Sequence, residues 1–358
     1  VGNEEQKEGE KMSLSVEIKK KFENFTLQIK LEKEKGILGL LGASGSGKSV
    51  TLQCIAGILT PDEGKICLNG RTLFDSEKGI NLPPQKRRVG YLFQNYALFP
   101  HMTVEKNILC GLSAEKDRKK RREKMQEAAE LFQIEPFLKK YPGELSGGQQ
   151  QRTALARILV SEPELLLLDE PFSALDAYLR DQLQIQVREL LEHFGRDTVL
   201  VSHSRDEVYQ LCSGLALLEQ GQILECGETK AVFQNPGSRT GAVLTGCKNI
   251  AAARKTGKYE VEVPEWGVRF DTARPVEDNL VAVGVRAHHF SPGEGENSYP
   301  VVCSGKMEGP FETTVLFQYG EKERETGKLW WRISGEQRAE KLPERLGVAA
   351  EHILLLYH

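Results

Sequence analysis

The pattern of apolar and polar positions divides the chain into two parts with different periods. In the first part, short apolar runs alternate with segments in which apolar residues recur at helical spacing. We predict buried strands at 36–42, 164–170 and 197–203, and a helix at 49–59. Alternation of buried strands and helices is typical of an α/β domain.

Residues 105–160 have a mostly helical pattern. Within them, 115–132 combines many basic and acidic residues with an apolar face, as in a solvated helix. Because acids rather than aromatics are interleaved with the basic residues, nucleic-acid binding is the weaker interpretation. We therefore expect a helical subdomain at about 95–160 and no nucleic-acid partner.

The pattern changes after the turn-rich stretch 233–241 to one with a period of two. Short strands separated by turn residues are typical of a small all-β barrel. The predicted strands lie within 259–270, 279–290, 312–319, 328–333 and 352–357. We predict two domains, an α/β domain at 1–237 and a β-barrel domain at 238–358.

Composition agrees with a soluble globular protein of this size. The chain has 358 residues, of which 39% are hydrophobic and 28% charged, and its net charge of −3 gives no reason to expect nucleic-acid binding. The seven cysteines form no C-x-x-C pair, which fits a reducing compartment better than a zinc site or a disulfide framework. No run of 18 apolar residues occurs, so we expect no membrane span.

A glycine-rich stretch between a predicted strand and a predicted helix carries the first chemical signal. Residues 42–49, GASGSGKS, match the phosphate-loop pattern G-x-x-x-x-G-K-[ST] in full. Glycines let backbone N–H groups approach phosphate oxygens, and the helix start presents its positive end to the anion. The expected nucleotide-binding residues here are Gly42, Ala43, Ser44, Gly45, Ser46, Gly47, Lys48, Ser49 and Val50.

A pair of acids follows the apolar run LLLL at 165–168. Asp169 and Glu170 therefore emerge at the end of a buried strand, where α/β sheets bind ligands. We expect Asp169 and the hydroxyl of Ser49 to hold Mg²⁺, and Glu170 to polarise the attacking water.

The stretch LSGGQQQR at 145–152 indicates a second anion site, because two glycines again precede a helix. A second site of this kind is unexpected if Lys48 already holds the nucleotide. It makes sense if it completes the nucleotide site of another copy of the chain.

With these motifs, residues 13–235 resemble the ATP-binding cassette (ABC) family, a P-loop NTPase fold. Gln94 is similar to the glutamine of its Q-loop, 173–176 (SALD) to its D-loop, and His203 to its switch histidine. The family's signature motif would be Ser146, Gly147, Gly148 and Gln149. Phe22 stands about where the family places the aromatic residue that stacks on adenine, with Phe25 as a close alternative.

The resemblance implies a mechanism and partners. Two copies would close head to tail over two ATP molecules, each held between Lys48 of one copy and Ser146 of the other. Glu170 would act as general base and His203 would contact the γ-phosphate, while Gln94 would reach Mg²⁺ or the attacking water. Transmembrane permease subunits and, indirectly, an extracytoplasmic solute-binding protein would complete an importer, with this chain peripheral at the cytoplasmic face of the membrane.

Two segments bear on what is transported. The β-rich tail resembles the TOBE-like (OB-like) regulatory barrel of importer ATPases. The stretch 73–94 resembles the molybdate, tungstate and sulfate importer ATPases, most closely those for molybdate. Import of a sugar, polyamine or iron, and a non-transport ABC ATPase, stay open as alternatives, as does oxyanion binding by the barrel.

The apolar residues after Gln94 suggest a contact with the permease. Tyr96, Leu98 and Phe99 follow it directly. They either pack the helical subdomain or line a partly exposed cleft for a short cytoplasmic helix of the permease. We expect some of the three to line such a cleft.

Overall fold

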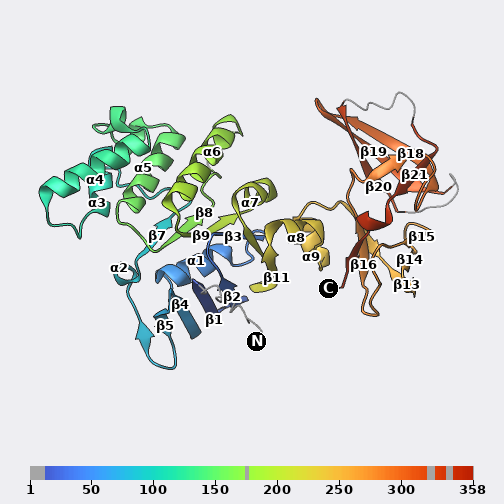
Figure 1. Ribbon diagram of the computed structural model, residues 1–358, viewed down its shortest axis with the longest axis horizontal. Helices are drawn as coiled ribbons and strands as arrows, with labels where there is room; N and C mark the ends of the chain where they lie inside the picture. The colour runs from blue at the N-terminus through green and yellow to red at the C-terminus, as the bar shows by residue number, and fades with distance from the viewer. Residues whose placement is uncertain (1–12, 174–176, 321–326, 336–341, 358) are drawn as a thin grey trace, which may run out of the picture. The chain divides into compact units, whose positions relative to one another are not determined.

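The computed structural model describes residues 13–173, 177–320, 327–335 and 342–357. The chain forms two compact units, Val1–Thr229 and Lys230–His358, which are treated separately below (Figure 1).

The first unit is built on one 11-stranded sheet with the order β6-β5-β4-β1-β2-β11-β10-β3-β9-β8-β7. Five neighbouring strands run parallel: β10 (Gly214–Glu219), β3 (Ile37–Gly42), β9 (Asp197–Ser202), β8 (Leu165–Asp169) and β7 (Val89–Leu92). The other six are β1 (Leu14–Phe22), β2 (Phe25–Lys33), β4 (Glu63–Leu68), β5 (Arg71–Asp75), β6 (Ile80–Asn81) and β11 (Gln222–Glu228). The predicted α/β domain is confirmed, whereas the antiparallel strands before and after α1 were not predicted.

The parallel strands are buried because their residues are apolar on both faces. Every residue of β8 and β9 is buried, as expected for strands covered by helices on both sides. In their register, Leu41 of β3 lies beside Ser202, and Asp169 lies beside Val201. The carboxyl ends of β3, β9 and β8 therefore meet at one edge of the sheet, where such folds bind ligands.

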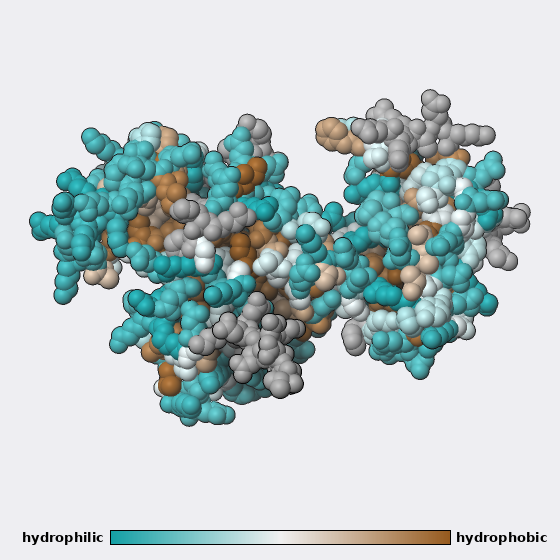
Figure 2. Space-filling model, in the orientation of Figure 1, coloured by the Kyte–Doolittle hydropathy of each residue, from teal (hydrophilic) through white to brown (hydrophobic). Residues whose placement is uncertain are grey.

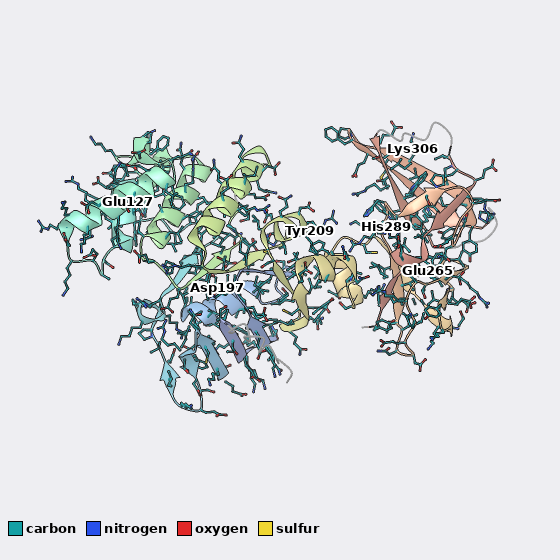
Figure 3. The ribbon with its side chains drawn as sticks, in the orientation of Figure 1. Glu127, Asp197, Tyr209, Glu265, His289 and Lys306 are labelled. Atoms are coloured by element: carbon teal, nitrogen blue, oxygen red, sulfur yellow. The ribbon has the colours of Figure 1, made fainter. Side chains whose placement is uncertain are left out.

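At the amino ends of β3 and β9, a buried ion pair joins the end of β2 to the start of β9. Lys33 Nζ lies 2.7 Å from Asp197 Oδ1, and the same oxygen accepts a hydrogen bond from the backbone N–H of Gly36. Asp197, at the start of β9, is labelled in Figure 3. This contact fixes the entry of β3, which leads directly into the phosphate loop.

Helix α1 (Lys48–Ala56) is shorter than the helix predicted at 49–59. It ends because Gly57 adopts a left-handed conformation, with φ of 80°. The fully buried side chain of Arg87 then donates hydrogen bonds to the last-turn carbonyls of Cys54 and Ile55, at 2.8 and 2.9 Å. A cation at this end also opposes the negative pole of the helix.

The remaining helices of this unit include the expected helical subdomain. Their bounds are α2 (Pro84–Arg87), α3 (Val104–Gly111), α4 (Arg118–Leu131), η1 (Glu135–Phe137), η2 (Pro142–Glu144), α5 (Gly147–Leu159), α6 (Ala177–Phe194) and α7 (Arg205–Leu211). Helices α3, α4 and α5 gather at one end of the unit (Figure 1). The basic helix α4 buries Met125, Ala128 and Ala129, and its surroundings are largely hydrophilic in Figure 2, as predicted for a solvated face.

The described residues of the second unit form three antiparallel sheets, and most of its buried apolar residues belong to one main core, which agrees with the predicted small all-β domain. Two short helices, α8 (Thr229–Gln234) and α9 (Arg239–Leu244), come first. The strands are β12 (Asn249–Ala252), β13 (Arg254–Gly257), β14 (Glu260–Val263), β15 (Val268–Asp271), β16 (Ala282–Val285), β17 (Phe290–Pro292), β18 (Tyr299–Glu308), β19 (Glu312–Tyr319), β20 (Leu329–Ser334), β21 (Arg345–Val348) and β22 (Leu354–Leu356), with the turn η4 (Ala350–His352) before β22.

The division falls eight residues before the position predicted at 237/238. The reason is that the segment after Thr229 is bonded to the β-sheets. Arg286 donates to the carbonyl oxygen of Phe233, Arg274 donates to Asn235, and the N–H of Tyr357 donates to Gly237. The turn-rich composition indicated where the linker lies, whereas these contacts assign residues 230–237 to the second unit.

Ending the chain after Thr229 should leave a soluble first unit that unfolds in one cooperative transition. The main core of that unit lies between Leu14 and Ile223 and needs no residue of the second. Ending it after Phe290 should instead unfold the second unit, because this cut removes β18 to β22 from the shared core. Circular dichroism melting of the two truncated chains is the measurement, and an insoluble chain after the first cut would contradict the division.

Candidate functional site

The phosphate loop connects β3 to α1 in a conformation that excludes side chains at two of its glycines. A Cβ on Gly42 would lie 2.3 Å from the carbonyl oxygen of Leu218. A Cβ on Gly47, which has a φ of 102°, would lie 2.5 Å from Leu27 Cδ1. Glycine is the residue that adopts positive φ without steric cost, so the loop can wrap closely around an anion.

Lys48 lies inside this loop. Its Nζ atom donates hydrogen bonds of 2.8 Å to the carbonyl oxygens of Gly42 and Ala43. Burial lowers the pKa of Lys48, whereas the carboxylates of Glu170 and Asp169 act in the opposite direction. The buried hydroxyl of Ser46 has no hydrogen-bond partner among the described residues. The loop therefore presents a cation and an unused hydroxyl to whatever binds there.

Asp169, at the end of β8, has both carboxylate oxygens engaged. Ser49 Oγ donates to Oδ1 at 2.8 Å, and the Tyr91 hydroxyl donates to Oδ2, also at 2.8 Å. Burial, followed by the charge of Asp169, raises the pKa of Tyr91, which keeps the hydroxyl protonated. The nearby side chain of Gln53 acts in the opposite direction on the pKa of Tyr91.

Glu170 follows in a left-handed conformation, with φ of 48°. Its Oε2 atom lies 2.8 Å from His203 Nε2 and accepts a hydrogen bond of 3.2 Å from Gln94 Nε2. Its backbone N–H is bonded to the carbonyl oxygen of Val201, which continues the pairing of β8 with β9. A non-glycine residue in this conformation is uncommon and is often found at functional sites.

A cavity of about 280 Å³ opens beside these groups. It is lined by Phe22, Phe25, Ser44, Gly45, Gly47, Lys48, Ser49, Val50 and Glu170. The structure thus brings most of the predicted loop residues together with Glu170. Phe22 is 41% exposed, and its ring centroid lies 6.0 Å from that of Phe25, so both aromatic rings face the cavity mouth.

The predicted signature residues lie elsewhere on the same unit, and they do not line this cavity. Ser146 is the N-cap of α5, where its Oγ accepts from the N–H of Gln149 and the Gln149 side chain accepts from the N–H of Ser146. This capping box stabilises the helix start. Ser146 is exposed, so the positive end of α5 is accessible from outside the chain.

Two further expectations have mixed outcomes. Of the predicted D-loop, only Ser173 is described, and 174–176 lie outside the described residues. Tyr96 was expected as a candidate cleft residue, but it is buried, with 4% of its surface exposed. The backbone turns there, with positive φ at Tyr96 and Ala97, and Arg157 donates to the carbonyl oxygens of both residues.

The other two residues of that set remain accessible. Phe99 is 41% exposed, and Leu98 is partly buried. The guanidinium of Arg157 lies 5.4 Å from the centroid of the Phe99 ring, a distance at which a cation and a ring attract each other.

Sequence reasoning did not find Tyr91, Gln53 or Arg157. Only the spacing of Ser49 and Gln53 on one helix face could have indicated a polar cluster.

Among the described residues, no group of three or more His, Cys, Asp or Glu side chains could hold a metal ion by itself. No helix in the described part of the chain is long and apolar enough to cross a membrane.

A strand, a phosphate loop and a helix, with two acids at the end of the neighbouring buried strand, define a P-loop nucleotide-binding protein. Residues 23–173 match the family described as ABC transporter. The chain is 43% identical over 230 residues to a probable sulfate/thiosulfate import ATP-binding protein CysA of Chlorella vulgaris, covering 63% of this chain and 95% of that protein.

Two further relatives extend the comparison. A molybdate/tungstate import ATP-binding protein WtpC of Pyrococcus horikoshii is 40% identical over 256 residues, covering 69% of this chain and 72% of that protein. An Fe(3+) ions import ATP-binding protein FbpC of Fusobacterium nucleatum is 35% identical over 321 residues, covering 80% of this chain and 83% of that protein.

Solved structures show the same fold. The structure of cbiO1 from Clostridium perfringens, part of an ABC transporter complex, matches with a TM-score of 0.55 and 27% identity over 63% of this chain and 91% of that one. A dimeric ATP-binding cassette bound to ADP and Pi matches with a TM-score of 0.51 and 25% identity over 60% of this chain and 98% of that one. The chain belongs to the ABC transporter family as an ATP-binding protein.

Replacing Gly47 with Ala should destabilise the first unit more than replacing Gly45 with Ala. Both glycines have positive φ, which costs a side chain about 1 kcal/mol. A Cβ on Gly45 meets open space, whereas one on Gly47 meets Leu27 and Phe25, which should add about 1–3 kcal/mol. Urea unfolding of both variants measures the difference, and equal free energies of unfolding would contradict the packing described.

Proposed function

We propose that this chain is the ATP-hydrolysing subunit of an ABC importer. The observation that carries the proposal is the meeting of Lys48, Ser49, Asp169 and Glu170 at one sheet edge beside the cavity. These groups are a cation for the phosphates, two oxygen donors for a metal ion and a carboxylate for water. An inactive regulatory module would have no need of them all.

Different residues of the site would bind the phosphates and the adenine base of ATP. The loop glycines and Lys48 would hold the β- and γ-phosphates through backbone N–H groups and one buried charge. Phe22, with Phe25 beside it, offers an aromatic surface for the adenine base at the cavity mouth. Ser46 has a buried hydroxyl without a partner among the described residues, which fits a phosphate oxygen as acceptor.

The residues present also fit Mg²⁺. The Ser49 hydroxyl and the Asp169 carboxylate lie 2.8 Å apart, and hard oxygen atoms of this kind, completed by phosphate and water, are what Mg²⁺ prefers. The side-chain amide N–H of Gln94 donates a hydrogen bond to Glu170. The amide oxygen of Gln94 therefore stays available to the cation or to water. When bound, Mg²⁺ supplies neutralisation of the charge on the phosphate oxygens.

Hydrolysis would depend on Glu170 as general base. His203 and Gln94 hold one of its oxygens, Oε2, and the other oxygen can accept a proton from an attacking water. The strained backbone at Glu170 fixes the direction of the side chain before ATP binds. His203 is 55% exposed, so it can exchange its contact with Glu170 for one with the γ-phosphate.

The exposed start of α5 suggests that two copies share each ATP. Its N–H groups and positive pole could receive an anion, yet no signature residue lines the cavity of its own chain. A head-to-tail pair would place Ser146 and Gly147 of one copy against the nucleotide on Lys48 of the other. The structural relative bound to ADP and Pi is dimeric, which supports this arrangement.

Permease subunits would attach the chain to the cytoplasmic face of the membrane. Two of the relatives described above are named for import of sulfate or thiosulfate and of molybdate or tungstate. We therefore favour an oxyanion such as molybdate as cargo, selected by an extracytoplasmic binding protein. Ferric iron is the second candidate, because that relative matches over the longest of these spans, 321 residues.

Replacing Glu170 with Gln should nearly abolish ATP hydrolysis while ATP binding persists, because the amide keeps the shape but cannot accept the proton. A loss of about 100-fold or more in rate is expected for removal of a general base. ATP should then trap a dimer, visible by size-exclusion chromatography with light scattering. Lys48→Ala is the matched comparison, since it should weaken ATP binding itself. A monomer at all concentrations, with ATP bound, would contradict the shared site.

Replacing Phe99 with Ser should reduce transport while the ATPase activity of the isolated subunit persists. The reason is that this exposed ring lies on the segment after Gln94, where a permease helix could dock. Uptake of molybdate, sulfate and ferric iron is measured in cells carrying only the variant. Leu131→Ser, at another exposed apolar position of the helical subdomain, is the control. Parallel loss of ATPase and transport would leave Phe99 only a packing role.

A further inference from the structure

We propose that Tyr91 is a positioning residue for the metal site: its hydroxyl fixes Asp169 in the orientation needed to bind the cation that accompanies ATP. This inference rests on the proposed role of Asp169 as a Mg²⁺ ligand. It assigns a role to a side chain that is outside the phosphate loop, the Q-loop and the acidic pair.

Asp169 is held from two sides. Tyr91 donates to Oδ2 of Asp169 and Ser49 donates to Oδ1, each at 2.8 Å. Ser49 belongs to α1 and Tyr91 belongs to β7. The two hydrogen bonds therefore join α1, β7 and β8 around one carboxylate.

The fold makes this contact possible. Strands β7 and β8 are parallel neighbours, with Tyr91 beside Leu167 and Leu92 beside Leu168. The long phenol side chain thus reaches from β7 to the acid that follows Leu168. A shorter or apolar side chain at position 91 could not donate to Oδ2, and the carboxylate would then be held at Oδ1 alone, by Ser49.

A carboxylate that serves as a metal ligand gains from being held in place. Ser49 and Asp169 would hold the cation, which supplies neutralisation of charge on the phosphates. Tyr91 would keep its hold on Oδ2, so that the carboxylate presents one oxygen in a fixed direction. Groups that hydrogen-bond to a metal ligand in this manner typically change metal affinity by about tenfold or more.

The position of Tyr91 also links the metal to the segment that follows. Gln94 follows Tyr91 by three positions, and its side chain is bonded to Glu170. The same strand end therefore contacts both acids, one through Tyr91 and one through Gln94. A displacement of β7 would move both contacts together, which ties the metal ligand to the segment carrying Phe99.

The test measures the affinity of the ATP-loaded protein for Mn²⁺, which replaces Mg²⁺ as a probe. Binding of Mn²⁺ is followed by electron paramagnetic resonance. Glu170→Gln serves as the parent so that ATP is not consumed. Adding Tyr91→Phe should weaken Mn²⁺ binding by about tenfold and leave ATP affinity in EDTA unchanged. Tyr259→Phe, which alters an exposed tyrosine of the second unit, should change neither value.

The outcomes separate the inference from the function on which it rests. If Tyr91→Phe binds Mn²⁺ like the parent, or loses ATP affinity equally in EDTA, the positioning role is wrong. If the parent itself binds no Mn²⁺ with ATP, or if Asp169→Asn binds it like the parent, the proposed metal site fails instead. Gln53→Leu should show a smaller loss than Tyr91→Phe, because it leaves both hydrogen bonds to Asp169 in place.

Discussion

The balance of charge around Lys48 is the constraint on which the rest of the site depends. Its ammonium is buried inside a loop of backbone, where it donates hydrogen bonds to two carbonyl oxygens. Removing a cation from water is costly unless opposite charge lies nearby. Asp169 and Glu170 supply part of that charge, and the phosphates of ATP would supply much more. Burial still outweighs the two carboxylates and lowers the pKa of Lys48, so an anion bound within the loop would stabilise the buried ammonium further.

The pairing of strands in the sheet brings Lys48, Asp169 and Glu170 together. Parallel pairing of β3, β9 and β8 brings the loop, Ser202 and Asp169 to the same edge. The central residues of β8 and β9 are apolar and buried, and Asp169 and Ser202 stand at the carboxyl ends of these two strands. Arg87 at one end of α1 and the phosphate loop at the other then hold that helix in position.

The sequence predicts a site residue when that residue belongs to a short contiguous motif, and it does not when the fold brings the residue to the site from elsewhere. Lys48, Ser49 and Asp169 could be predicted because each lies in a short motif whose spacing has a physical reason. Tyr91 could not, since a tyrosine in a strand has no special meaning until β7 is known to lie beside β8. Which of Tyr96, Leu98 and Phe99 is buried could not be predicted, because apolar composition does not say which way a loop turns. The bonds from Arg157 to the carbonyl oxygens of Tyr96 and Ala97 fix that turn, and they come from 60 and 61 residues away.

The central claim is that each ATP is held by two copies of the chain, and mixing two inactive variants tests it most directly. Lys48→Ala damages the phosphate loop, and Ser146→Arg damages the exposed start of α5. In a mixed head-to-tail dimer, both defects fall in one site and the other site is intact. ATPase activity should therefore reappear when the two variants are mixed. No activity in the mixture, with mixed dimers shown to form, would contradict a shared site.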